Sequence, residues 1–254
     1  MRDKVLFLGS GGSMGVPVIG CACEVCTSFS SRDKRLRPSV LLKKGGQQFI
    51  IDMGPDYRQQ ALKYRINVLD GILLTHAHYD HIGGLDEVRI YTFRNHRPVP
   101  CLLSRATWER LKTCYHYLFP KNEKEGMFKF HILDNLQGKT IFEGLEVRYF
   151  SYIQSGMYVN GLRVNKLAYV TDIMEYEETV FDALEGIETL IISARRWERS
   201  SAHLSIEQTI EFARRVKARW TYFTHISHEI HYEKTMQKLP DGFALAYDGM
   251  ELLL

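Results

Sequence analysis

Four side chains that bind transition metals lie within six residues of the chain, in the segment 75–81 (THAHYDH). They combine imidazole nitrogens with a carboxylate, a donor set that suits zinc, manganese or iron. Donors so close together on one turn can point into a common space, and two metal ions can share them. The sequence therefore predicts a metal centre formed by His76, His78, Asp80 and His81.

A second group of metal-binding side chains lies nearer the start of the chain, where Cys21, Cys23 and Cys26 fall within six positions. In a reducing compartment this spacing favours a metal–thiolate site over disulfides. A closed structural zinc site needs four ligands, so one more must come from elsewhere. The best candidate is His228, in the segment 224–228 (THISH). Such a zinc would tie the loop around 21–26 to the last part of the chain.

The elements that must position these residues alternate between short apolar strands and amphipathic helices. The apolar run 69–74 predicts a buried strand that leads directly into Thr75 and His76. Ser205 followed by Gln208 predicts a capping box that opens a helix to about residue 217. The remaining predicted strands are 4–8, 39–42, 48–51, 146–152, 166–170, 189–192 and 220–224, and the remaining predicted helices are 56–64, 107–119 and 177–184.

The composition is that of an ordinary globular protein, with 254 residues of which 45% are hydrophobic, 12% aromatic and 25% charged. No repeat or linker divides it, so we expect a single domain over residues 1–254. A net charge of +3 is too small to argue for a nucleic-acid or membrane-surface partner. The opening residues lack a signal-peptide pattern, and no run approaches the ~18 apolar residues of a spanning helix. We therefore expect a cytoplasmic protein without membrane association.

The motif T-H-x-H-x-D-H after an apolar strand resembles the signature of the metallo-β-lactamase superfamily. The resemblance implies an α/β fold, a four-layer αββα sandwich, with a di-metal site at the edges of its sheets. It also implies that Asp52, at the end of the strand 48–51, orients ligand histidines. One metal would then be held by His76, His78 and Asp172, and the other by Asp80, His81, Asp172 and His225.

The stretch FLGSGGSMGVPVIGCACEVC (7–26), together with THISH, is similar to a narrower branch, the phosphoribosyl cyclic phosphate phosphodiesterases of phosphonate breakdown. That branch carries a structural zinc on a matching loop, which implies the same role for the three cysteines and His228. The resemblance is least specific between residues 91 and 140. Within it, the segment 91–135 is either a lid with an aromatic wall or a packed insertion, and we favour packing.

The superfamily normally supplies a further metal histidine after the strand 146–152, but this chain has Gln154 at that position. A neutral amide is a weaker donor than imidazole, so the first metal would have a weak or absent fourth contact. Two interpretations stay open: a hydrolase adapted to a harder metal, or a relative with one tight metal and altered or lost catalysis. We favour the first, because the other implied ligands are present.

His203 resembles the family's histidine that contacts the substrate phosphate without binding metal and protonates the leaving alkoxide. Imidazole suits this work because its unperturbed pKa is about 6.5. Arg195 opens the basic run 195–199 just before it, where one guanidinium could bind a second anionic group. The other basic run, 32–37, includes Arg35 and is expected mainly on a solvated face.

These residues together predict a metal-dependent hydrolase: a phosphodiesterase that uses a metal-bound hydroxide on a small phosphodiester, such as a cyclic ribose phosphate. Asp80 and His203 are the expected catalytic residues. The expected cofactors are two divalent metals, zinc or manganese with one held weakly, and one structural zinc. Two alternatives stay open: a nucleic-acid phosphodiesterase of the tRNA-processing or exonuclease type, and a metal-binding relative with altered or lost hydrolysis that serves cofactor biosynthesis. The low net charge disfavours nucleic acid as a partner, and a homodimer is an open alternative to a monomer.

Overall fold

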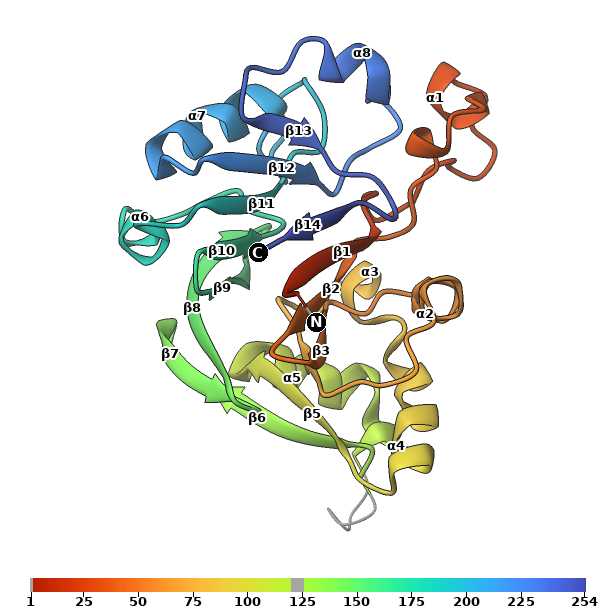
Figure 1. The fold of residues 1–254 in the computed structure, drawn as a ribbon, viewed down its shortest axis with the longest axis vertical. Helices are drawn as coiled ribbons and strands as arrows, with labels where there is room; N and C mark the ends of the chain where they lie inside the picture. Colours follow the sequence, from red (N-terminus) through yellow and green to blue (C-terminus); the bar gives the residue numbers. More distant parts are fainter. Residues whose placement is uncertain (1, 120–125) are drawn as a thin grey trace.

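Two seven-stranded β-sheets face each other at the centre of the protein, in a computed structural model that describes residues 2–119 and 126–254 (Figure 1). Helices cover the outer face of each sheet (Figure 1). The order of layers is therefore helix, sheet, sheet, helix. This arrangement confirms the predicted four-layer αββα sandwich.

The first sheet is antiparallel on one side and parallel on the other. The strand β3 is the boundary, since it pairs antiparallel with β2 and parallel with β4. In spatial order its strands are β14 (Glu251–Leu253), β1 (Lys4–Gly9), β2 (Ser39–Lys44), β3 (Gln47–Ile51), β4 (Gly71–Leu73), β5 (Val99–Ser104) and β6 (Phe128–Leu133).

The second sheet repeats this mixed pattern. Its strand β10 pairs antiparallel with β9 and parallel with β11. In spatial order the strands are β13 (Phe243–Leu245), β12 (Trp220–Thr224), β11 (Thr189–Ser193), β10 (Leu167–Val170), β9 (Met157–Val164), β8 (Leu145–Gln154) and β7 (Gln137–Phe142).

Alternation along the strands explains why both faces of each sheet are buried. In β1, Val5 and Phe7 contribute to the core between the two sheets, whereas Leu6 and Leu8 contribute to the core beneath the helices. In β11, Ile191 faces the other sheet and Ile192 packs beneath α7. Each sheet thus supplies two apolar faces, because successive side chains of a strand point to opposite sides.

The helices are short and follow the strands in sequence. They are α1 (Glu24–Thr27), α2 (Tyr57–Tyr64), α3 (Tyr79–Ile82), α4 (Arg89–Asn95), α5 (Arg105–Cys114), α6 (Thr179–Leu184), α7 (Ile206–Val216) and α8 (Tyr232–Met236), with single 3-10 turns at Ser31–Asp33, Leu85–Val88 and His116–Leu118. Among the described residues, no helix has the length and apolar character that crossing a bilayer requires.

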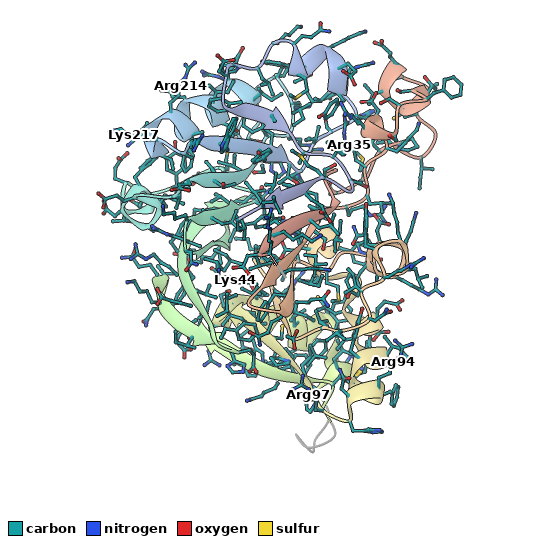
Figure 2. All side chains as sticks on the ribbon, viewed as in Figure 1. Arg35, Lys44, Arg94, Arg97, Arg214 and Lys217 are labelled. Atoms are coloured by element: carbon teal, nitrogen blue, oxygen red, sulfur yellow. The ribbon has the colours of Figure 1, made fainter. Side chains whose placement is uncertain are left out.

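Two helix termini test the sequence-based boundaries. The capping box predicted for α7 is present, with Ser205 and Gln208 each accepting a hydrogen bond from the other's backbone N–H. The last turn of this helix carries exposed Arg214, and its C-cap residue, exposed Lys217, follows directly (Figure 2). The helix predicted over 107–119 is wrong in extent. It begins after the cap of Ser104, whose hydroxyl accepts from the Thr107 N–H, and it ends at Cys114.

The segment 91–135 contributes to the first sheet rather than forming a separate lid. Its described residues include β5 and β6, which pair in parallel, and β5 also pairs with β4. Residues 120–125 of this segment lie outside the described residues. In the part that the structure describes, β5 and β6 of this segment are thus packed into the sandwich.

Candidate functional site

The predicted metal-binding residues follow strands whose carboxyl ends meet at one edge of the sandwich. Asp52 follows β3, the segment 75–81 follows β4, Asp172 follows β10, and His225 follows β12. These strands belong to the parallel halves of the two sheets. Because parallel strands place their carboxyl ends at the same edge, loops far apart in sequence converge there. The side chain of His78 is half-buried, and the other predicted metal-binding side chains are buried: Asp52, His76, Asp80, His81, Asp172 and His225.

Three of these residues have left-handed backbone conformations that non-glycine residues rarely adopt. The φ angles are 59° at Asp52, 56° at Asp172 and 58° at His225. Each residue stands at the first or second position after its strand, where the chain turns sharply. Such conformations cluster at functional sites, where the surrounding structure maintains them against their cost. The residue types alone did not reveal this feature.

Asp52 orients one histidine of the site through its carboxylate. Its Oδ1 accepts a hydrogen bond from the Thr75 N–H at 2.8 Å, and its Oδ2 lies 2.7 Å from His81 Nδ1. A proton on Nδ1 leaves the Nε2 lone pair of His81 directed into the site. That Nε2 is buried and has no hydrogen-bond partner among the described residues. An orphaned buried nitrogen of this kind fits a metal ligand.

The donor atoms form two groups that meet at Asp172. In the first, His76 Nε2 lies 2.9 Å from His78 Nδ1 and 3.7 Å from Asp172 Oδ2. In the second, His225 Nε2 lies 3.2 Å from both Asp80 Oδ2 and Asp172 Oδ1.

These separations can be compared with a coordination polyhedron. Ligand atoms about 2.1 Å from a tetrahedral zinc are about 3.4 Å from one another. The separation of 3.3 Å between His81 Nε2 and Asp80 Oδ2 also lies near this value. The donors therefore fit two divalent metals, with one oxygen of Asp172 directed toward each group.

Electrostatics favours charged carboxylates at this site even without a metal. Burial acts to raise the pKa of Asp172, but the imidazoles of His225, His81 and His76 outweigh it and hold the pKa well below its ordinary value. For His81, burial acts to lower the pKa, but Asp80, Asp52 and Asp172 raise it well above its ordinary value. Metal binding would therefore release a proton from His81.

His203 is buried next to the same cluster, as the expected catalytic role requires. Its ring centroid is 5.0 Å from that of His225, and its Nδ1 has no hydrogen-bond partner among the described residues. The Ser200 hydroxyl and the His203 backbone hydrogen-bond each other in both directions, which holds the turn. Burial, with smaller contributions from His225 and Arg195, lowers the pKa of His203 to about 4.

Gln154 ends β8 and is 4% exposed. Its Oε1 is buried without a hydrogen-bond partner among the described residues. The preceding residue, Ile153, pairs through its backbone with Glu175, three residues after Asp172. The backbone N–H of Asn160 on the adjoining strand β9 donates to the carbonyl of Thr75. The end of β8 therefore lies between two segments that carry donors of the site.

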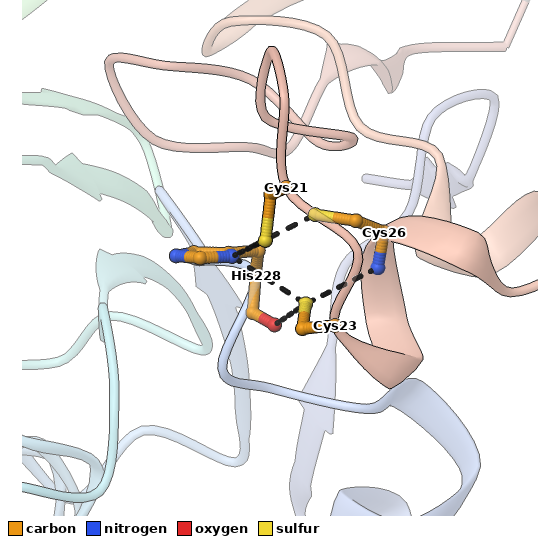
Figure 3. A group of neighbouring side chains, drawn as sticks. All are labelled: Cys21, Cys23, Cys26 and His228. Carbon is orange, nitrogen blue, oxygen red and sulfur yellow. Dashed lines mark hydrogen bonds between the residues drawn. The ribbon is translucent and has the colours of Figure 1, made fainter.

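The three cysteines and His228 come together at the predicted second site (Figure 3). The Nδ1 of His228 lies 3.3, 3.5 and 3.6 Å from the sulfurs of Cys21, Cys23 and Cys26, respectively. In a tetrahedral zinc site, sulfur and nitrogen ligands are about 3.6 Å apart. The Cys26 N–H donates to Cys23 Sγ and, with His228, lowers the pKa of the Cys23 thiol to about 6. This donor set fits a structural zinc.

Arg35, expected on a solvated face, is instead 1% exposed. Its guanidinium pairs with buried Asp33 at 2.9 Å and donates to the carbonyls of Ser227 and Ile230. Figure 2 shows it beside the segment that leads to α1. Arg35 therefore links the segment that follows the cysteine loop to the residues around His228. The basic run 32–37 had predicted a solvated position for it instead. Sequence reasoning missed this link because the acceptors are backbone carbonyls almost two hundred residues away.

Comparison with known proteins agrees with this geometry. The family described as "Beta-lactamase superfamily domain" matches residues 47–226. A solved structure described as a new diphosphatase from the PhnP family is 36% identical, with a TM-score of 0.93, over 100% of this chain and 98% of that chain. Zn(2+)-bound PqqB from Methylobacterium extorquens has the same fold, with a TM-score of 0.78 at 19% identity over 99% of this chain and 100% of that chain.

A curated relative matches the chain along almost its whole length. The octanoyltransferase of Porphyromonas gingivalis is 31% identical over 257 residues, which cover 99% of this chain and 51% of that protein. The chain thus spans about half the length of this relative.

Proposed function

Because the chain belongs to the beta-lactamase superfamily, we propose that this metal-dependent hydrolase is a phosphodiesterase that acts on a small phosphodiester. The observation that carries the proposal is the pair of donor groups joined at Asp172, whose Oδ1 faces His225 and whose Oδ2 faces His76. Divalent metals bound there would act as Lewis acids on phosphoryl oxygens and activate water near neutral pH. Zinc and manganese both suit these donors.

The buried histidine beside the centre supplies the proton that the reaction needs. His203 lies close enough to His225 to approach an ester oxygen of a phosphate held at the centre. The pKa of His203 is about 4 without substrate. A phosphate anion in contact with the ring favours the imidazolium and raises that pKa. His203 would then donate a proton to the departing alkoxide, which is the role of a general acid.

Arg195 supports the binding of the same anion. It is half-buried, stands two residues after β11 and lies close enough to His203 to lower the pKa of that histidine. A small cleft beside it is lined by Gly12, Ser13 and Ser227. A half-buried guanidinium in this place would neutralise a phosphoryl oxygen.

A diphosphate is the second candidate substrate. The PhnP-family structure that is 36% identical over the whole chain is described as a diphosphatase. A diphosphate would present the same charged phosphoryl oxygens to the centre. Two alternatives from the sequence analysis, hydrolysis of nucleic acid and loss of hydrolysis, must be distinguished from the proposal by experiment.

The test measures metal content and hydrolysis on the same protein. We would purify the chain without chelators, count metals by inductively coupled plasma mass spectrometry, and repeat the count after supplementation with manganese. The metal-loaded protein would then receive bis(4-nitrophenyl) phosphate, a nucleoside 2′,3′-cyclic phosphate, a dinucleoside diphosphate and a short RNA.

The outcomes separate four possibilities: hydrolysis of a small phosphodiester, of a diphosphate, of nucleic acid, and loss of hydrolysis. Near three metals per chain with turnover of the small diesters supports the proposal. If the diphosphate is turned over faster than the diesters, the substrate class is a diphosphate and not a phosphodiester. Activity confined to RNA, with steep salt dependence, would revive the nucleic-acid reading. Full metal loading without turnover of any substrate refutes the proposal.

A further inference from the structure

A cavity of about 320 Å³ lies between α5 and the hairpin formed by β8 and β9. Its wall includes Ala77, the residue between His76 and His78 of the candidate metal centre. The helix contributes Thr107 and Arg110. The cavity therefore opens beside the place where the scissile phosphate would bind, and not on a remote face.

The hairpin that forms the opposite wall has a tight two-residue turn that fixes the register of β8 and β9. Its turn has φ angles of 49° at Ser155 and 78° at Gly156, which is the pattern of a tight type I′ turn. The turn joins Gln154 directly to Met157, which pairs with it. Met157 and Tyr158 then line the cavity. The same hairpin thus carries buried Gln154 and the cavity residue Tyr158.

The chemistry of the lining selects for a ring and for negative charge. Tyr158 is 43% exposed and lines the cavity, so its ring is accessible to a ligand there. Arg110 is the charged residue of the lining, and no acidic side chain among the described residues lines the cavity. Exposed Arg110 forms no ion pair within the described parts of the chain, whereas Arg105 on the same helix pairs with Asp134 at 2.7 Å.

We propose that this cavity binds the organic group attached to the scissile phosphate, and that this group is a nucleoside-sized ring system carrying a second negative charge. The inference rests on the proposed function and assigns its substrate class. The volume of about 320 Å³ lies at the lower end of the range for small-ligand sites, about 300–1,000 Å³, which suits a single nucleoside. Tyr158 stacks on the ring, and Arg110 binds the second anion.

The experiment compares three chromogenic esters that share one leaving group, 4-nitrophenolate. They are bis(4-nitrophenyl) phosphate, the 4-nitrophenyl ester of thymidine 5′-phosphate, and the same nucleotide ester with an added 3′-phosphate. Steady-state kcat/KM would be measured for the wild type, Arg110→Ala, Tyr158→Ala and the matched control Arg105→Ala. The metal content of each variant would be counted alongside.

The wild type should prefer the ester with the 3′-phosphate. Arg110→Ala should lower kcat/KM about tenfold on that ester alone, because one charge-assisted contact is lost. Tyr158→Ala should lower it several-fold on both nucleotide esters and leave bis(4-nitrophenyl) phosphate unchanged. Arg105→Ala should match the wild type. Equal effects of the Arg110 and Arg105 variants, or equal loss by Tyr158→Ala on all three esters, would overturn the assignment.

A binding measurement separates this inference from the proposed function. Thymidine 3′,5′-bisphosphate would be titrated calorimetrically into the metal-loaded wild type and the three variants. If no ester is hydrolysed, the proposed function fails, but weaker binding confined to Arg110→Ala and Tyr158→Ala still supports the cavity as the ligand site. Identical binding by all four proteins, or no binding by any of them, refutes it.

Discussion

Asp52 provides a sharp test of the proposed metal centre, because its two carboxylate oxygens accept hydrogen bonds from opposite sides. Oδ1 accepts from the Thr75 N–H at 2.8 Å, and Oδ2 faces His81 Nδ1 at 2.7 Å. An Asp52→Asn substitution keeps the shape of the side chain but replaces one acceptor oxygen with a donor NH2 group. Whichever way the amide turns, its NH2 group faces a buried N–H.

The two orientations of the amide have different consequences. If the NH2 group faces Thr75, a buried backbone N–H loses its acceptor, which costs about 1–3 kcal/mol of folding free energy. If it faces His81, the ring proton moves from Nδ1 to Nε2, the atom that lies 3.3 Å from Asp80 Oδ2. A protonated Nε2 cannot bind metal. We therefore expect the affinity of the centre to fall about 10- to 100-fold.

The assay is competition between the protein and a chromogenic chelator for zinc and for manganese. The cysteine cluster serves as an internal reference, because Asp52 contacts none of its residues. The matched control is Asp56→Asn: Asp56 accepts from the Arg37 N–H at 2.8 Å and occupies the N-cap position just before α2. Affinity within twofold of the wild type, together with an unchanged urea midpoint, would refute the orientation of His81 by Asp52.

Four further changes have defined outcomes. His203→Ala should lower kcat on a phosphodiester about 10²- to 10⁴-fold with metal content unchanged; loss of metal in mass spectrometry would make it a ligand instead. Cys26→Ser should remove one zinc per chain and lower the melting temperature, and an unchanged zinc count would contradict the Cys₃His site. Gly54→Ala should lower both the melting temperature and the metal affinity, because a Cβ there would overlap the carbonyl oxygen of Asp80. A wild-type melting temperature together with wild-type metal affinity would show that the backbone shifts to accept the Cβ. Burial raises the pKa of Asp248 from its ordinary value of 3.8 to about 6, so the folded state holds this proton more tightly than the unfolded chain. The free energy of unfolding should then fall by about 3 kcal/mol as the pH rises from about 4 to about 6. Urea titrations at several pH values should show this fall in the wild type and not in Asp248→Asn.

The sequence alone was sufficient for the features that depend on neighbours along the chain. Six residues of one turn carry His76, His78, Asp80 and His81, so their proximity follows from covalent geometry. The capping box of α7 is equally local, since its two partners are three residues apart. The apolar runs predicted eight of the fourteen strands in the described residues. The resemblance to a known superfamily then implied the sandwich and the more distant candidates Asp172 and His225.

Tertiary structure decided what depends on partners distant in sequence. Arg35 belongs to a run that predicts a solvated face, yet buried Asp33 and two carbonyls near His228 hold it inside. The low pKa of His203 results from its burial beside His225, which no local pattern encodes. The cavity next to Ala77 exists only because α5 and the β8–β9 hairpin meet there. Burial, pKa and cavity shape depend on the packing of whole layers, whereas residue spacing determines only which side chains are available to those layers.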